Sequence, residues 1–212
     1  MDEQIVKIEV DESVTLRGAF TPAQREDAPG AVVLHPHPLY GGSMHNNVVE
    51  TLVAAAVDKG WGALRFNFRG VGGSSGEHDQ GRGEQEDVLA AAAWLAQRCP
   101  GPLVLMGYSF GSLVGAAAAS RLDNLAAGVW VAPPLILGNL PDWPSDAGPL
   151  LMVTGDRDSF SSLEGLKEYA GRMGARVSLV VFANGDHFFV GRESALFDEV
   201  SGFLSGLDFM AH

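Results

Sequence analysis

Apolar positions along this chain recur with two spacings, one typical of β-strands and one typical of α-helices. Residues 4–10 alternate between apolar and polar, as a half-buried strand does, and residues 14–20 are expected to form the partner strand. Short apolar runs predict further buried strands at residues 31–35, 62–67, 125–132, 149–154 and 176–182, with one more starting at residue 103. Helical patterning predicts helices over residues 45–59, 84–98, 110–121, 162–173 and 192–204.

After the opening hairpin, the predicted strands and helices alternate. This alternation predicts an α/β fold in which a mostly parallel eight-stranded sheet is flanked by helices on both faces. A chain of 212 residues suits one domain with a sizeable core, and no break in composition divides it. We therefore expect residues 1–212 to form a single domain.

The composition narrows the choice of partners and compartment. The formal net charge of −12 argues against nucleic acid or an anionic membrane as a partner. The single cysteine, Cys99, excludes an internal disulfide. The acidic start lacks the features of a signal peptide, and the longest apolar run, residues 88–96, is far too short to span a bilayer. These features predict a cytoplasmic protein without a membrane partner.

The stretch from residue 103 to residue 113 predicts a buried strand, a sharp turn and the start of a helix. Within it, Gly107-Tyr108-Ser109-Phe110-Gly111 fits the pattern G-x-S-x-G, which presents a serine hydroxyl on a strained strand-to-helix turn. Bulky neighbours would clash in such a turn, so Gly107 and Gly111 keep both flanks small. The following helix directs its free N–H groups toward the hydroxyl, where they favour a developing negative charge. Ser109 is the candidate nucleophile.

A serine hydroxyl is a weak nucleophile until a base removes its proton. His187 follows the last predicted strand in a loop, where an imidazole could reach across the strand ends. His35 and His78 are weaker candidates for the same role. The chain order of serine, aspartate and histidine is the order expected of this turn.

An acid that orients His187 is expected after the strand at residues 149–154, where Asp156 and Asp158 both lie. Asp186 is adjacent to the histidine, and neighbouring side chains in an extended segment point apart. We therefore interpret Asp186 as a turn residue.

Five segments, each following a predicted strand, are informative together: the G-x-S-x-G motif and residues 35–42, 65–72, 155–158 and 185–189. With these segments the chain resembles the α/β-hydrolase superfamily over essentially its whole length, and within it the small, lidless bacterial serine hydrolases. The resemblance implies the α/β-hydrolase fold and a catalytic triad. It selects Asp158 as the acid, because the family uses the second aspartate of Gly-x-x-Asp, and leaves Asp156 as a turn residue. The segment at residues 133–149 is too short for a substantial cap domain.

Stabilisation of an oxyanion by this motif requires two backbone N–H donors. The first is the N–H of Phe110, which follows the serine. The second lies in the loop after the third strand, where Pro36 and Pro38 have no N–H to offer. The remaining donors there are His37, Leu39 and Tyr40. The family resemblance implies His37.

Two other patterns do not support a cofactor. The glycine-rich residues 70–76 miss the nucleotide-binding spacing G-x-G-x-x-G by one position and lack the Gly-Lys-Ser/Thr ending. His35 and His37, with His45 downstream, have no nearby carboxylate that would complete a zinc site. No metal and no cofactor are therefore expected.

These observations together predict that Ser109, His187 and Asp158 cleave a small-molecule carboxylic ester or thioester through an acyl-enzyme. Peptidase or acyltransferase chemistry would use the same triad, because a fold does not fix its substrate. A non-catalytic binding module on the same scaffold is a further alternative, although it would not require the three residues together. With no cap predicted, we expect small soluble substrates and no activation at a lipid–water interface.

Overall fold

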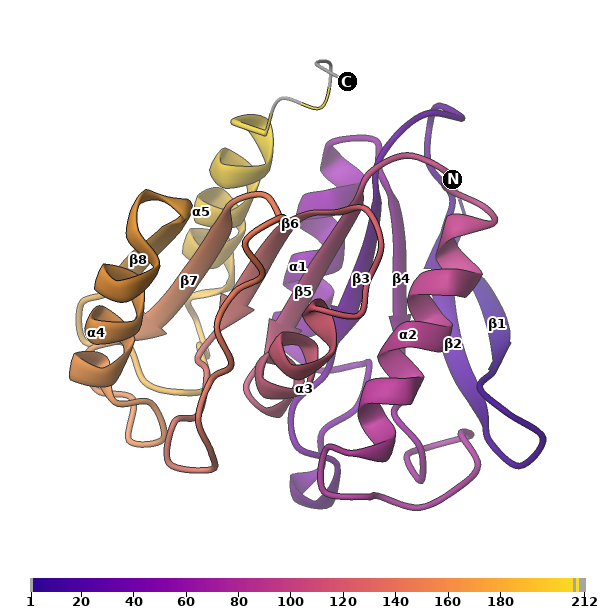
Figure 1. Ribbon diagram of the computed structural model, residues 1–212, viewed down its shortest axis with the longest axis horizontal. Helices are drawn as coiled ribbons and strands as arrows, with labels where there is room; N and C mark the ends of the chain where they lie inside the picture. The colour runs from indigo at the N-terminus through magenta and orange to yellow at the C-terminus, as the bar shows by residue number, and fades with distance from the viewer. Residues whose placement is uncertain (1, 208, 210–212) are drawn as a thin grey trace.

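Within the part of the chain that the computed structural model describes, residues 2–207 and 209, eight strands form one sheet in the order β1-β2-β4-β3-β5-β6-β7-β8 (Figure 1). The pairs β1–β2 and β2–β4 are antiparallel, and all other neighbours are parallel. The bounds are β1 Gln4–Glu9, β2 Thr15–Thr21, β3 Gly30–Leu34, β4 Gly62–Phe66, β5 Leu103–Tyr108, β6 Leu125–Val131, β7 Leu150–Gly155 and β8 Val177–Phe182. The predicted mostly parallel eight-stranded sheet is confirmed.

Helices cover both faces of the sheet, as predicted. On one face α1 (Asn47–Asp58) packs against α5 (Glu193–Ser205), and the other face carries α2 (Gly83–Ala96), α3 (Phe110–Ala119) and α4 (Leu163–Met173) (Figure 1). Each face of the sheet carries its own hydrophobic core, and alternate residues of β3 point into one core or the other. Val32 and Leu34 pack with the residues of α2 and α3, whereas Ala31 and Val33 pack with those of α1. A strand buried on both faces therefore reads as a continuous apolar run.

Helix boundaries differ slightly from the predicted ones for reasons of local chemistry. The helix predicted from residue 45 begins at Asn47, because the side chain of Asn46 accepts a hydrogen bond from the N–H of Val48 and caps the first turn. Ser162 caps α4 in the same way through the N–H of Gly165. Two short 3-10 segments were not predicted. The first, η1 (Pro38–Tyr40), lies in the loop after β3, and the second, η2 (Gly174–Arg176), overlaps the strand predicted at residues 176–182 by one residue, so that β8 begins at Val177.

The parallel strands bring their carboxyl ends to one edge of the sheet, which is the lower edge in Figure 1. The connections that follow β3, β4, β6, β7 and β8 gather there, and such an edge is where open α/β sheets bind ligands. The described connection between β6 and β7 contains no α-helix, so no cap domain is inserted at this point. No helix in the described part of the chain is long and apolar enough to cross a membrane.

Candidate active site

The turn between β5 and α3 holds Ser109 in a conformation that only its surroundings can maintain. Its φ of 52° and ψ of −120° lie outside the usual regions for a residue with a side chain. A Cβ on Gly107 would lie 2.7 Å from backbone atoms of Gly111. A Cβ on Gly111 would lie 2.6 Å from the carbonyl oxygen of Leu34 and 2.8 Å from that of His35. Both glycines are therefore required for the close approach of α3 to β5 and to the loop after β3.

The structure brings Ser109, His187 and Asp158 together from three separate loops. Ser109 Oγ lies 2.9 Å from His187 Nε2, and His187 Nδ1 lies 2.8 Å from Asp158 Oδ2. The three residues are only 6%, 7% and 9% exposed, respectively. A hydroxyl, an imidazole and a carboxylate in this sequence of contacts can move a proton off the hydroxyl while the imidazole stays oriented.

Asp158 is held by more than the histidine. Its Oδ1 accepts hydrogen bonds from the N–H groups of Phe160 at 2.8 Å and Ser161 at 3.0 Å. Burial opposes ionisation of this carboxyl, but the hydrogen bonds from His187 and the two N–H groups outweigh it and hold the pKa of Asp158 below its usual value. Asp156, two residues earlier, is exposed. Asp186 accepts a hydrogen bond from the N–H of Phe188 in a local turn.

The loop that carries His187 is fixed by aromatic residues whose role the sequence pattern did not indicate. The hydroxyl of Tyr108 donates a 2.9 Å hydrogen bond to the carbonyl oxygen of His187. Burial raises the pKa of Tyr108, so the phenol keeps the proton that it donates. The ring of Phe160 lies 4.6 Å from the imidazole of His187, measured between centroids. In the sequence, both aromatics were indistinguishable from ordinary core residues.

His35 is buried and serves the backbone. Its Nε2 accepts a hydrogen bond from the N–H of Phe68 at 3.0 Å, and its Nδ1 lies 2.6 Å from the carbonyl oxygen of Pro36. Because an amide only donates and a carbonyl only accepts, the proton of the neutral ring sits on Nδ1. Burial lowers the pKa of His35 to about 4. With both nitrogens engaged, His35 joins the loop after β3 to the loop after β4.

The short segment η1 uses most of the N–H groups in the loop after β3. The N–H of Leu39 donates to His37 Nδ1 at 3.2 Å, and the N–H of Tyr40 donates to the carbonyl oxygen of His37 at 3.1 Å. Among the described residues, no acceptor receives the N–H of His37 or that of Phe110, the first residue of α3. Two backbone donors are therefore free, one on the residue that follows Ser109 and one in the loop after β3.

His78 contacts a buried acid rather than a member of the triad, and the contact lacks the geometry of a hydrogen bond. Its Nδ1 lies 2.6 Å from Oε1 of Glu84, which is fully buried. Glu84 also accepts hydrogen bonds from the N–H groups of Asp79 and Gly81, so it organises the loop before α2. No set of three His, Cys, Asp or Glu side chains within residues 2–207 and 209 is grouped as a metal site would be.

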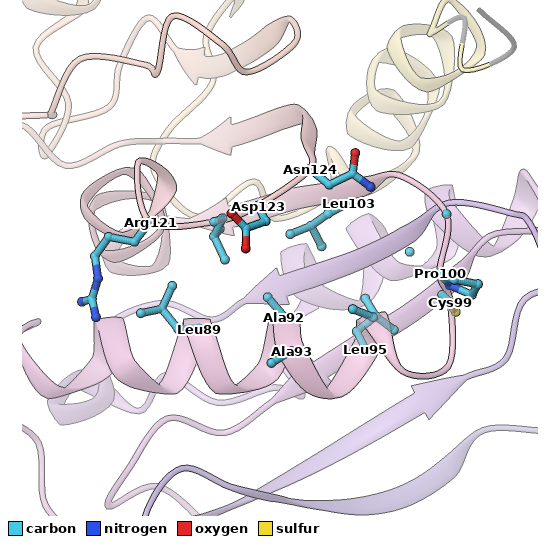
Figure 2. Close-up of a pocket in the computed structure, with 14 residues that line it drawn as sticks. Leu89, Ala92, Ala93, Leu95, Cys99, Pro100, Leu103, Arg121, Asp123 and Asn124 are labelled. Atoms are coloured by element: carbon cyan, nitrogen blue, oxygen red, sulfur yellow. The ribbon is translucent and has the colours of Figure 1, made fainter. Parts of the chain in front are cut away.

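A separate cavity of about 460 Å³ lies at the amino ends of β3 and β5, away from the triad. Figure 2 shows its floor of Leu89, Ala92 and Leu95 from α2, with Leu103 and the 121–124 loop facing them. Its only charged lining groups in the described chain are Arg121 and Asp123. None of the residues that carry the candidate chemistry lines this cavity.

Comparisons with known proteins agree with this architecture. A family model described as an alpha/beta hydrolase domain matches residues 29–200. An uncharacterized protein of Rickettsia prowazekii is 35% identical over 184 residues, covering 82% of this chain and 77% of that protein. A solved structure of an alpha-beta serine hydrolase homologue from Coxiella burnetii is 32% identical, covers 96% of this chain and 98% of that chain, and superimposes with a TM-score of 0.83.

A Xanthomonas campestris protein, described as a serine hydrolase of the same fold without a lid, is 29% identical and covers 97% of this chain and 94% of that chain, with a TM-score of 0.84. The resemblance found in the motifs is therefore confirmed, and so is the fold class. By its matched residues and its eight-stranded sheet, this chain belongs to the alpha/beta hydrolase domain family.

Proposed function

We propose that this protein is a serine hydrolase that cleaves small carboxylic esters or thioesters through an acyl-enzyme. The observation that carries the proposal is the chain of contacts from Ser109 Oγ to His187 Nε2 at 2.9 Å and from His187 Nδ1 to Asp158 Oδ2 at 2.8 Å. The strained turn at Ser109 supports it, because strain of that kind persists where geometry serves chemistry.

In the proposed reaction, Ser109 Oγ attacks the carbonyl carbon while His187 Nε2 takes the hydroxyl proton. Asp158 keeps the other imidazole proton on Nδ1 and stabilises the imidazolium that forms. The oxygen of the tetrahedral intermediate receives hydrogen bonds from the N–H groups of Phe110 and His37. His187 then returns its proton to the leaving group as the bond to that group breaks. In the second half of the reaction, water attacks the acyl carbon while His187 takes a proton from it, and His187 returns this proton to Ser109 Oγ as the acyl-enzyme bond breaks. No step requires a cofactor.

The free N–H groups support the oxyanion assignment. Of the donors that the prolines leave in the loop after β3, Leu39 and Tyr40 are already hydrogen-bonded within η1, whereas His37 is not. The N–H of Phe110 is free because the first residues of a helix have no intrahelical acceptor. Loss of one such donor typically costs about 3 kcal/mol of transition-state stabilisation.

The surroundings of the triad favour substrates with apolar parts. Large apolar side chains are exposed on the loops at the carboxyl edge of the sheet, namely Leu39, Tyr40, Ile136, Leu137, Phe188 and Val190. These loops hold no inserted lid in the described chain, so a small ester could reach Ser109 directly.

Covalent labelling with a fluorophosphonate probe tests the proposal. We expect the wild-type protein to be labelled at Ser109 and to hydrolyse para-nitrophenyl esters. Ser109→Ala should abolish both, whereas Ser120→Ala, an exposed serine at the other end of the same helix, should change neither. Folded wild-type protein that resists the probe would contradict the proposal and favour a binding module on the same scaffold.

A further inference from the structure

A recess of about 350 Å³ lies beside the proposed oxyanion hole. It is bounded by the start of α3, by residues 78–85, which lead into the first turn of α2, and by the loop at residues 137–139. Its volume falls at the lower end of the range for small-molecule sites. His37, Phe110 and His78 line it, and their rings lie within 5.5 Å of one another between centroids. No Asp or Glu lines this recess, although the whole chain carries a net charge of −12.

The hydrogen bond from Leu39 determines which nitrogen of His37 carries a proton. Because the N–H of Leu39 donates to Nδ1, that nitrogen has no proton, and the neutral ring carries its proton on Nε2. Burial, together with the nearby His78, lowers the pKa of His37 and so favours this neutral form. No described residue accepts a hydrogen bond from Nε2. The side chain, which lines the recess, therefore keeps one unused donor.

The chemistry of the triad indicates which part of an ester enters the recess. The leaving group must lie near His187 Nε2, because it takes its proton there. The oxyanion must point toward the N–H groups of Phe110 and His37. The recess is lined by those two residues and not by His187. The substituent that remains for it is the acyl chain.

We propose that this recess binds the acyl chain and that His37 Nε2–H selects acyl chains that carry a hydrogen-bond acceptor. The proposal rests on the function proposed above and adds a substrate class to it: short acyl groups that bear a ketone, hydroxyl or carboxylate. Apolar contact would come from Leu113 and Val114 of α3, which line the same recess. The acceptor would pair with the His37 N–H, for which no described residue supplies an acceptor. Arg82 also lines the recess, so substitution at His37 itself is needed to assign the selectivity to this ring.

The pair formed by His78 and Glu84 acts as a positioning group for this donor. Glu84 fixes the loop through two N–H groups and lies 2.6 Å from His78 Nδ1. The ring of His78 then lies 5.1 Å from that of His37, while Phe110 lies 4.8 Å from it on another side. Contacts with both rings restrict the orientation of the His37 imidazole.

Two esters with the same leaving group test the proposal. Para-nitrophenyl levulinate has the five-carbon chain of para-nitrophenyl valerate with a ketone added. For each protein we would divide kcat/KM on the levulinate ester by kcat/KM on the valerate ester. Dividing the result by the ratio of the rate constants for hydrolysis of the two esters by hydroxide ion corrects for their intrinsic reactivity. The corrected value is called the ratio below. The wild-type ratio should be about 3 to 10, because one neutral hydrogen bond supplies a preference of that size.

Substitutions at His37 separate its two nitrogens and leave its backbone N–H in place. His37→Asn keeps an acceptor for the N–H of Leu39 but removes the donor at Nε2, so its ratio should fall to about one. His37→Gln places an amide N–H near the position of Nε2, so its ratio should stay above one. His45→Asn, at an exposed histidine outside the recess, should match the wild type.

The proposal is overturned when the wild-type ratio does not exceed one, or when His37→Asn retains the wild-type ratio. Fluorophosphonate labelling of Ser109 in the same samples keeps the two proposals distinct. Labelled protein without acceptor selectivity rejects the role of His37 and leaves the serine hydrolase intact, whereas unlabelled wild-type protein rejects the hydrolase itself.

Discussion

His35 should make the protein sensitive to acid, because it is buried as a neutral ring between two loops that frame the active site. Its Nε2 accepts from the N–H of Phe68 at 3.0 Å, and its Nδ1 faces the carbonyl oxygen of Pro36 at 2.6 Å. Protonation of Nε2 would replace that acceptor by a donor that faces another donor. Exchanging His35 for Gln keeps an acceptor for Phe68 and removes the titratable group.

The magnitude follows from the difference between the folded and unfolded pKa values. Burial lowers the pKa of His35 from 6.5 to about 4 in the folded protein. The unfolded chain therefore takes up the proton first as the pH falls, and stability is lost between about pH 6.5 and about pH 4. At about pH 5 the loss amounts to about 2 kcal/mol, and it levels off at about 3 kcal/mol below the folded pKa.

Urea denaturation at several pH values between about 7.5 and 5 measures this loss. Because other groups also titrate in that range, the comparison is between the slopes of the wild type and of His35→Gln. The variant should show a fall in the free energy of unfolding that is smaller by about 2 kcal/mol. His45→Gln, a control at an exposed histidine, should leave the slope of unfolding free energy against pH as it is in the wild type. Parallel curves for the wild type and His35→Gln would refute the buried neutral histidine.

Further predictions concern the triad, its support and the open edge. Asp158→Asn should lower kcat on one ester by about 10³- to 10⁴-fold, since an amide favours the wrong imidazole tautomer, and the exposed Asp156→Asn should lower it much less; the reverse ranking would overturn the choice of acid. Tyr108→Phe should cost about 1–3 kcal/mol in urea denaturation, because the carbonyl oxygen of His187 loses a buried donor; an unchanged free energy of unfolding would contradict that role. Rates on a sparingly soluble ester should rise smoothly through its solubility limit. A sharp rise as emulsion forms would refute the absence of a lid and would indicate that residues 135–140 move.

The fold could be predicted from the sequence because its elements depend on local patterns. A run such as residues 31–35, bounded by turn residues, predicts a buried strand wherever it lies in the sheet. The order of strands was not available from such patterns. That β4 lies between β2 and β3 depends on contacts between residues far apart in the chain, such as Phe20 with Leu64. Periodicity contains no information on those pairings.

The candidate site could be predicted only where a motif or a resemblance singled out a residue. Ser109 and His187 followed from the motif and from their places after strands, but the choice of Asp158 over Asp156 came from the family resemblance. In the structure the difference is physical: Asp158 is buried against His187, whereas Asp156 is exposed. The support from Tyr108 was not predictable, because its hydroxyl reaches a carbonyl 79 residues away.

The segment His35-Pro36-His37-Pro38 shows how one short stretch can serve two purposes. Alternation along an extended backbone turns His35 into the core, where the N–H of Phe68 and the carbonyl of Pro36 engage both of its nitrogens. The two prolines restrict the backbone and have no N–H groups of their own. The N–H of His37 is therefore the only backbone donor among residues 36–38. A donor held in this way needs little reorganisation when a negative charge develops. Acid that protonates His35 should therefore weaken the proposed oxyanion hole as well as the fold, because the same ring holds the loop that carries the donor.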